Sequence, residues 1–346
     1  MDPMTRKQFL ETVAIAGTAA VLPALSRAAQ KEKPTANIKW AYQDHWSMIS
    51  PQGLTSPYTS VKYFDSFIKQ IAGLGFQGLY SFASRLPTYR SMFGSPKNAL
   101  EFLQARGIEK IIGGFFDYAY VDKYHAPHVR ETHDNIFRDF EQIMKNAEGF
   151  GMEKLVIMPA SIYWQTEPVT DEKLHAIADL WNRVGKMTLS HGIKASFHHE
   201  FWCGVRNKED IEKFYAWTDP QYVFYFCDTA QHVIAGVDPV QLYMKYHDRC
   251  IGFHFKDTHN VDTKGEYRLP PDAEMLAPSV ARWFWEMGTP EGLVDFPAMM
   301  RAMKEYHYTG WVGVEHDKAE IGGGSYAEST CIAAWYIKNV LSPIYS

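Results

Sequence analysis

Short apolar or β-branched runs alternate along the chain with longer stretches whose apolar residues recur at helical spacing. This alternation indicates βα units arranged around a parallel sheet. The predicted strands are residues 38–43, 76–82, 108–116, 154–159, 194–199, 222–228, 251–256 and 311–315. The predicted helices are residues 61–74, 97–106, 131–149, 171–191, 208–217, 238–248, 296–306 and 326–340. The chain therefore carries eight βα repeats.

Eight βα repeats predict an α/β protein of the (β/α)8 TIM barrel type, whose usual size is about 250 residues plus insertions. Glycines such as Gly107 and Gly192 stand where the helices are expected to end in a left-handed turn. The segment from Thr258 to Pro290 does not repeat the pattern, and we expect an insertion there, after strand seven, that could form a lid. A doubly wound sheet is the rival architecture, but a dinucleotide-binding version would need Gly-x-Gly-x-x-Gly after the first strand, where the sequence has none. Residues 37–346 are thus predicted to form a single barrel domain.

The first 30 residues have the three-part pattern of an export signal peptide. Arg6 and Lys7 precede an apolar stretch from about residue 13 to residue 25, and Ser26-Arg27-Ala28 supplies a small-x-small cleavage pattern. The segment Arg-Lys-x-Phe-Leu resembles a twin-arginine signal in which Lys7 replaces the second arginine. We therefore expect a periplasmic mature protein.

An amphipathic helix of the mature fold is the alternative for this N-terminal segment. It fits poorly, because Gly17 and Pro23 interrupt the segment and its apolar residues do not form one stripe. The apolar run is also short of the ~20 residues that a membrane-spanning helix needs, and no later run approaches that length. No membrane span is expected in the mature protein.

Composition narrows the range of partners. The formal net charge is −5 and the sequence has no run rich in Lys or Arg, so nucleic acid is not an expected partner. Aromatic residues make up 15% of the chain, which fits a carbohydrate pocket but also a large core. The four cysteines show neither a Cys-x-x-Cys pair nor zinc-finger spacing, so they indicate no thiolate metal site and no disulfide framework.

Ionisable residues collect where the predicted strands five to eight end, which is the end of a (β/α)8 barrel that carries chemistry. Strand alternation places on the inward face His198 and Glu200, then Asp228, then His254 and Lys256, and finally Glu315. Imidazole and carboxylate groups from four strands suit Mn²⁺, Zn²⁺, Co²⁺ or Mg²⁺. Any one of these residues could instead be a satisfied polar group at a strand end. Bunched carboxylates, however, are costly to bury unless a cation or hydrogen bonds compensate their charge, so the set as a whole predicts a divalent metal site.

Four segments at these strand ends are similar to the motifs of a known family. They are Phe197-His198-His199-Glu200, Cys227-Asp228-Thr229-Ala230-Gln231-His232, the run from Asp248 to Asp257, and Gly310-Trp311-Val312-Gly313-Val314-Glu315. Through them, residues 37 to 340 resemble the xylose-isomerase-like TIM barrels, the superfamily of sugar (phosphate) isomerases and epimerases. The resemblance implies that the metal ligands are a residue of strand five followed by Asp228, His254 and Glu315.

Strand five departs from the epimerases of that family, whose ligand there is a glutamate that also acts as an acid or base. The aligned residue in this chain is His198. Glu200, two positions on and on the same face, could replace that carboxylate as a ligand or serve as a base beside the metal. This difference at strand five makes an epimerase less favoured. It favours instead an enzyme similar to the lyases and hydratases of 3-keto-glycosides, which also resemble this chain.

The reactions of the family share one step, in which a metal polarises a carbonyl so that a base can remove the adjacent C–H proton. Glu200 or Glu315 would be the general base, and His232 or Lys256 would hydrogen-bond substrate or stabilise the developing oxyanion. Lys256 could equally well have a structural role, in an ion pair with neighbouring acids at the strand ends. The implied cofactor is a divalent metal, with Mn²⁺ the first choice.

The sequence thus predicts a divalent-metal-dependent sugar isomerase or epimerase that acts by proton abstraction next to the carbonyl of a sugar or keto-sugar. The alternative on the same scaffold is a 3-keto-glycoside lyase or hydratase that works by β-elimination. A non-catalytic sugar-binding protein and an AP-endonuclease-like phosphodiesterase are less favoured, the latter because the net charge is negative. The identity of the sugar and the formation of a homo-oligomer are left open.

Overall fold

The computed structural model describes residues 38–44, 61–116, 124–160, 169–201, 203–262, 282–317 and 325–345. These residues belong to one compact unit, Asn37–Ser346. The predicted export signal, residues 1–30, lies outside the described residues. Within the described ranges, none of the helices combines the length and the apolar character that crossing a membrane requires.

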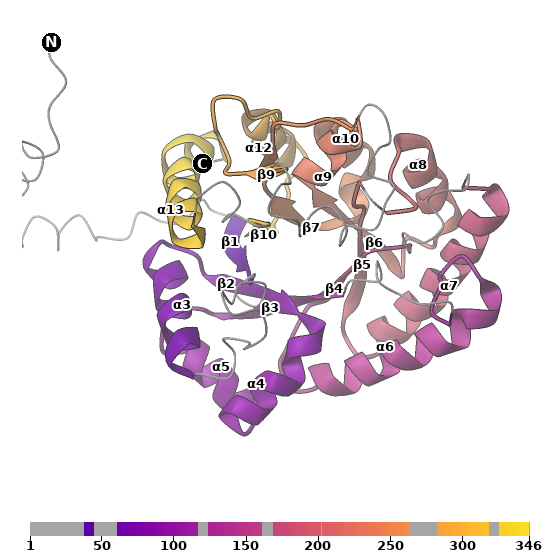
Figure 1. The fold of residues 1–346 in the computed structure, drawn as a ribbon, viewed down its shortest axis with the longest axis horizontal. Helices are drawn as coiled ribbons and strands as arrows, with labels where there is room; N and C mark the ends of the chain where they lie inside the picture. Colours follow the sequence, from indigo (N-terminus) through magenta and orange to yellow (C-terminus); the bar gives the residue numbers. More distant parts are fainter. Residues whose placement is uncertain are drawn as a thin grey trace, which may run out of the picture. The chain divides into compact units, whose positions relative to one another are not determined.

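Eight parallel strands close into a barrel in the order β1-β10-β7-β6-β5-β4-β3-β2 (Figure 1). The barrel strands are β1 Ile38–Gln43, β2 Gly78–Phe82, β3 Lys110–Phe116, β4 Lys154–Ile157, β5 Lys194–His198, β6 Val223–Asp228, β7 Cys250–Phe255 and β10 Gly310–Val314. The barrel closes where β1 pairs with β10, from Ile38 opposite Gly310 to Tyr42 opposite Val314. This architecture confirms the predicted (β/α)8 barrel, and each predicted strand coincides with an observed one to within two residues at either end.

Side chains alternate between the inside of the barrel and the helical layer. In β1, Trp40 and Tyr42 join the large apolar cluster between sheet and helices, whereas Ala41 joins a smaller cluster inside the barrel. The other members of that inner cluster are Tyr80, Ile112, Phe115, Val156, Phe226 and Trp311. Large aromatic rings therefore fill the inside of the barrel, which is a packed core and not a pore. A ligand can bind only at one of the two ends of the barrel.

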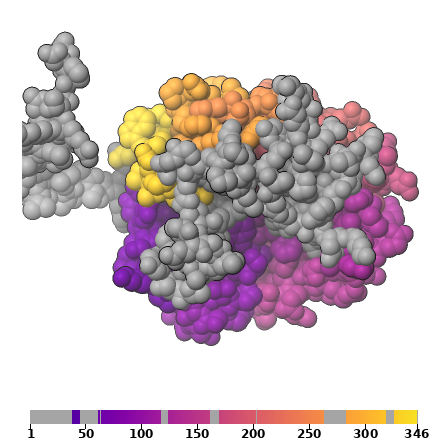
Figure 2. Space-filling view, viewed as in Figure 1, coloured from indigo at the N-terminus to yellow at the C-terminus, as the bar shows by residue number. Residues whose placement is uncertain are grey.

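The surrounding helices are α3 Val61–Gly73, α4 Leu86–Phe93, α5 Pro96–Gln104, α6 His133–Ala147, α7 Asp171–Ser190, α8 Lys208–Trp217, α9 Thr229–Ile234, α10 Pro239–Tyr246, α12 Phe296–Glu305 and α13 Tyr326–Tyr336. Seven of them begin after a capping side chain: Ser95, Thr170, Asn207, Asp228, Asp238, Asp295 or Ser325. Each cap accepts a backbone N–H that the first helical turn leaves unpaired, which stabilises a helix by about 1 kcal/mol. In the space-filling view, the C-terminal helices, in yellow, border the N-terminal helices, in indigo, so the layer of helices closes around the barrel (Figure 2).

Two helices, α4 and α9, were not expected from the sequence. Both are short, and α4 buries only Leu86 and Tyr89 before Gly94 ends it with a φ of 77°. Two turns carry too little periodicity to be distinguished from a loop. The predicted helix over residues 326–340 is also modified, because α13 continues into a π-helical turn, Ile337–Leu341, and then into α14, Ser342–Tyr345.

The chain between β7 and β10 contains an additional element, in agreement with the predicted insertion. Two short strands, β8 Asp257–Thr258 and β9 Phe284–Trp285, pair antiparallel outside the barrel. Thr258 Oγ1 also donates a hydrogen bond of 2.8 Å to the carbonyl of Trp283. Residues 263–281, where a lid was expected, lie outside the described residues.

Candidate metal centre

Four side chains from neighbouring strands converge at the C-terminal end of the barrel. His198 ends β5, Asp228 ends β6, His254 lies near the end of β7, and Glu315 follows β10. Asp228 and His254 are register partners on adjacent strands. One potential ligand atom from each of the four residues lies within 4.8 Å of all the others, and all four side chains are buried. The structure thus brings together the four residues predicted as metal ligands.

Asp228 links the site to the helix that follows it. Its Oδ1 accepts the backbone N–H of Gln231 at 2.9 Å and so caps α9. Its Oδ2 lies 2.8 Å from Nε2 of His198 and 3.8 Å from Nδ1 of His254. Burial alone raises the pKa of the Asp228 carboxyl, but Lys256 and His198 lower it by more, so the pKa lies below its usual value. One oxygen therefore fixes the carboxylate, and the other faces the candidate metal position as an anion.

The His254 ring is held in place by aromatic neighbours and not by hydrogen bonds. Phe226 packs against it at a centroid distance of 4.6 Å and Tyr80 at 5.6 Å. Its Nδ1 lies 3.0 Å from Oε2 of Glu315, yet within the described part of the chain neither ring nitrogen has a hydrogen bond of acceptable geometry. Burial lowers the pKa of His254, which favours the neutral imidazole that metals bind.

Lys256 places a buried ammonium group beside these carboxylates. Its Nζ lies 2.5 Å from Oε2 of Glu315, 2.5 Å from Oδ2 of Asp317 and 3.1 Å from Oδ2 of Asp228. Burial lowers the pKa of Lys256, but Asp228, Asp317 and Glu315 raise it by more, to well above the usual value. Lys256 is therefore a permanent cation, suited to orienting the carboxylates and to stabilising negative charge, and unsuited to accepting a proton.

The sequence motifs of the xylose isomerase-like TIM barrel family match residues 68–331, more than half of the chain. The chain belongs to this family. The inosose dehydratase of Lacticaseibacillus casei is 28% identical over 162 residues, which make up 47% of this chain and 53% of that protein. The chain thus spans about half the length of the curated relatives it matches.

Solved structures of other proteins share the fold. A sugar phosphate isomerase/epimerase from Parabacteroides distasonis superposes with a TM-score of 0.65 at 17% identity, over 92% of this chain and 98% of that one. The IolI protein, solved with a zinc atom, superposes with a TM-score of 0.64 at 17% identity, over 89% of this chain and 99% of that one. The relatives are enzymes. At these identities the structural likeness shows the fold alone.

The residues present fit a divalent cation. Two imidazoles and two carboxylates are ligands that Zn²⁺, Mn²⁺ and Co²⁺ accept. Among the described residues, no hydrogen-bond partner is found for the buried ring nitrogens of His254, which points to the same conclusion, because a buried polar atom normally has a partner. The described thiols take no part, since Cys203, Cys227 and Cys250 are buried elsewhere in the apolar core and Cys331 is exposed; all four are free.

The sequence left two candidate metal ligands on strand five, His198 and Glu200, and the two side chains lie in different positions in the structure. The His198 ring lies with Asp228, His254 and Glu315. Glu200 follows just beyond the strand, with Oε1 3.4 Å from Nδ1 of His198, and is also buried. Geometry therefore places His198 within the group of four and Glu200 beside that group.

His232 does not join the group. It lies on α9, where its Nε2 is 2.8 Å from the hydroxyl of Tyr225, a residue of the outer cluster. Burial lowers the pKa of His232 to about 4, so the ring is neutral. Its role in binding substrate stays a prediction. His199 and His316 also turn to the outer layer, where His199 contacts Tyr215 and His316 contacts Tyr42.

Two residues of the site were not singled out from the sequence. Asp317 pairs with Lys256, and its place two residues beyond Glu315, on the same face, was the available signal. Gln43 ends β1 inside the barrel and is fully buried, and within the described residues its Oε1 has no hydrogen-bond partner. A polar residue at the end of a barrel strand was the signal here as well.

Four tryptophans follow barrel strands at the end that carries the candidate metal centre, and rings of this kind could stack on a sugar. Trp164 and Trp202 lie outside the described residues. Trp283 stacks on Phe201 at 5.3 Å, and Trp285 stacks on His259 at 4.1 Å. Trp283 and Trp285 therefore already have ring partners within the protein.

Proposed function

We propose that the protein is a divalent-metal-dependent enzyme that removes a proton next to the carbonyl of a sugar or keto-sugar. The observation that carries this proposal is the convergence of four buried ligand-type side chains, with ligand atoms within 4.8 Å of one another, at the chemically active end of the barrel. A binding protein for neutral sugars would not need to bury two carboxylates and an ammonium group together, because such burial is costly.

His198, Asp228, His254 and Glu315 would hold the ion, and we propose Mn²⁺ as the first candidate, with Zn²⁺, Co²⁺ and Mg²⁺ as alternatives. When bound, a divalent ion supplies Lewis-acid polarisation of a carbonyl oxygen. Lys256 would keep Asp228 and Glu315 ionised and in position through its contacts of 3.1 and 2.5 Å. It would also offer positive charge to an oxygen that becomes negative during the reaction.

Glu200 is the proposed general base. Its carboxylate is buried, lies 3.4 Å from His198, and is not one of the four convergent ligands. Glu315 is a weaker candidate, because its Oε2 lies 2.5 Å from the buried ammonium group of Lys256 and because Glu315 is one of the four convergent ligands. A carboxylate in a buried ion pair is a poor proton acceptor.

Elimination of water is the outcome we favour over epimerisation. The chain is 28% identical over 162 residues to an inosose dehydratase. Its similarity to an isomerase/epimerase is a similarity of fold only. Strand five also carries His198 where the related epimerases have a glutamate, which leaves Glu200 as the carboxylate base on that strand. In a β-elimination of water, one base can remove the proton next to the carbonyl and then return it to the departing hydroxyl group, which leaves as water, whereas a two-carboxylate epimerase needs two such groups.

The test is proton exchange in D₂O. The purified protein is assayed for bound metal and incubated with a 3-keto-glycoside, a keto-inositol or a free ketose, with and without chelator, and the products are followed by NMR. We expect deuterium at the carbon next to the carbonyl, or loss of water across that carbon, and we expect both to stop on chelation. Absence of metal together with absence of exchange on all three substrates would refute the proposal.

Matched variants separate the site from general damage to the fold. Asp228→Asn and His254→Gln should lose metal and turnover together. Asp238→Asn is the control for the first, because Asp238 is an exposed cap of α10 and asparagine caps equally well. His191→Gln is the control for the second, since His191 is exposed after α7. Both controls should keep metal and activity.

We also propose that residues 1–30 direct export to the periplasm, as the sequence pattern indicates. The test is fractionation of cells that produce the full chain. Arg6→Gln combined with Lys7→Gln should retain the protein in the cytoplasm if the signal is of the twin-arginine type. Unchanged export of this variant would instead indicate the general secretory route.

A further inference from the structure

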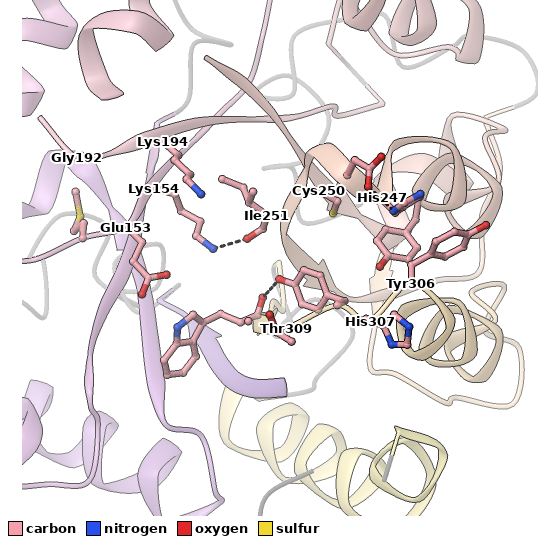
Figure 3. Close-up of a pocket in the computed structure, with 16 residues that line it drawn as sticks. Glu153, Lys154, Gly192, Lys194, His247, Cys250, Ile251, Tyr306, His307 and Thr309 are labelled. Carbon is pink, nitrogen blue, oxygen red and sulfur yellow. Dashed lines mark hydrogen bonds and ion pairs between the residues drawn. The ribbon is translucent and has the colours of Figure 1, made fainter. Parts of the chain in front are cut away.

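A pocket of about 550 Å³ lies at the end of the barrel opposite the candidate metal centre (Figure 3). Its wall includes the first residues of four strands: Lys154 of β4, Lys194 of β5, Cys250 of β7 and Gly310 of β10. The candidate ligands lie at the other ends of the strands. The volume falls within the ~300–1,000 Å³ of typical small-molecule pockets. We call it the basal pocket.

Two lysines stand next to each other in this pocket. Lys154 and Lys194 are register partners on β4 and β5, so their side chains leave the sheet on the same face. Figure 3 shows the two side chains running side by side, with both amines directed toward Ile251. Like charges directly opposite each other on neighbouring strands destabilise a sheet. The pair therefore calls for a compensating charge.

The protein compensates this charge only in part, because Glu153 attracts Lys154 electrostatically but forms its ion pair with Lys110, and Lys194 is exposed to solvent. Lys154 is 4% exposed, and its Nζ donates one hydrogen bond, to the carbonyl of Ile251 at 2.5 Å. Lys194 lies over the ring of Phe224 at 5.1 Å. Neither ammonium group has an ion-pair partner among the described residues. An ammonium group has three N–H donors, so Lys154 has donors to spare.

The basal pocket is also lined by two acidic residues. Glu153 forms an ion pair with Lys110, and Asp248, whose side chain is 89% exposed, lies 3.0 Å from Nδ1 of His247. The remaining wall is aromatic, with Tyr306, Tyr308 and Trp311 among the lining residues. Aromatic walls around a cationic corner suit an organic molecule with one anionic group.

Packing inside the barrel accommodates the Lys154 side chain next to a glycine of the neighbouring strand. Gly113 is its register partner on β3, and a Cβ at Gly113 would lie 3.0 Å from Cγ of Lys154. Glycine at this position therefore leaves room for the lysine stem. Burial lowers the pKa of Lys154 to about 8, in keeping with a buried charge that the protein compensates only in part.

We propose that the basal pocket binds a small organic oxyanion, a carboxylate or a phosphate monoester about the size of a sugar, with its anionic group between Lys154 and Lys194. The anion offsets the repulsion of the two lysines and takes the free donors of Lys154. The ring or chain of the ligand packs on the aromatic wall. Lysine binds such groups as a point charge, so either kind of anion fits. This site is independent of the proposed function, because it shares no residue with the candidate metal centre.

The test is calorimetric titration of the full chain with glucose 6-phosphate, with glucuronate and with uncharged methyl glucoside. We expect one site for at least one anion, with a Kd of about 1 mM or lower, and no heat from methyl glucoside. The anion that binds tells whether the source is a phosphate or a carboxylate. Absence of binding by both anions at up to about 10 mM would overturn the proposal.

Variants locate the binding site. Lys154→Met and Lys194→Met should each weaken binding by at least about tenfold, which corresponds to about 1.4 kcal/mol. Lys186→Met, on the exposed face of α7, should leave it unchanged. Asp228→Asn should also leave it unchanged, because Asp228 lies at the other end of the barrel. Binding that survives in both lysine variants, or that is lost in Asp228→Asn, would place the anion elsewhere and refute the proposal.

Discussion

The ammonium group of Lys256 lies 2.5 Å from Oε2 of Glu315, one of the four candidate metal ligands. The same ammonium lies 3.1 Å from Oδ2 of Asp228, a second ligand candidate. Both carboxylates therefore have a built-in cation beside the position that a metal ion would take. This internal cation compensates part of their charge whether or not a metal is bound.

Replacement of Lys256 by Met should make folding depend on metal. Without Lys256, Asp228 and Glu315 would lose a buried cationic partner, and removal of one partner of a buried pair costs about 3–5 kcal/mol. A bound ion would offset much of that loss. We expect chelation to lower the Tm of Lys256→Met by several degrees more than that of the wild type, measured by calorimetry with and without EDTA. An equal effect of EDTA on both proteins would contradict this coupling, and Lys186→Met serves as the control.

Glu200→Gln should separate catalysis from metal binding. The amide keeps the size of the side chain but cannot accept a proton as the carboxylate does, and loss of a general base costs about 10²–10⁴-fold in rate. We expect metal content, measured by mass spectrometry, to stay at the wild-type level while proton exchange falls by that factor. His198→Gln should lose the metal. The reverse pattern, with metal lost only in Glu200→Gln, would make Glu200 the strand-five ligand.

Lys154→Met should stabilise the protein in a pH-dependent way. Burial lowers the pKa of Lys154 from 10.5 to about 8. Between these values the unfolded chain binds more protons, so the stability of the wild type rises with pH across this window. The variant should be more stable at pH 7 by on the order of 1–3 kcal/mol, and the difference should shrink toward pH 10. Urea unfolding of both proteins at several pH values measures this; a difference that does not change with pH would argue against the lowered pKa.

His307→Gly should raise the Tm. His307 follows α12 and has a φ of 54°, the one non-glycine residue with positive φ among the described residues. A side chain in this region costs about 1 kcal/mol relative to glycine, which corresponds to roughly 2–4 °C for a chain of this size. Gly107→Ala is the reverse control, because Gly107 has a φ of 92° and a Cβ there would meet only Ala72 at 3.6 Å. Calorimetry that shows no rise for His307→Gly would mean that the histidine makes compensating contacts.

The barrel was predictable because the pattern that specifies it is local. Alternation within a strand separates Trp40 and Tyr42, which pack outward, from Ala41, which packs inward, and this separation is visible in the sequence. The same alternation placed His198 and Asp228 at the barrel mouth. Short elements escaped prediction for the opposite reason. The helix α9 has six residues, and its start depends on one oxygen of Asp228 as a cap.

The sequence by itself determined the eight βα units, the end of the barrel that carries ionisable residues, and the types of ligand collected there. Only the tertiary structure decided which of these residues meet. It turned His232 toward Tyr225, put Lys256 between the carboxylates, and left Lys154 and Lys194 side by side at the opposite end. The physical reason is that strand and helix periods act over a few residues. Distances between strand ends depend on register, on the barrel's closure and on the caps that begin each helix.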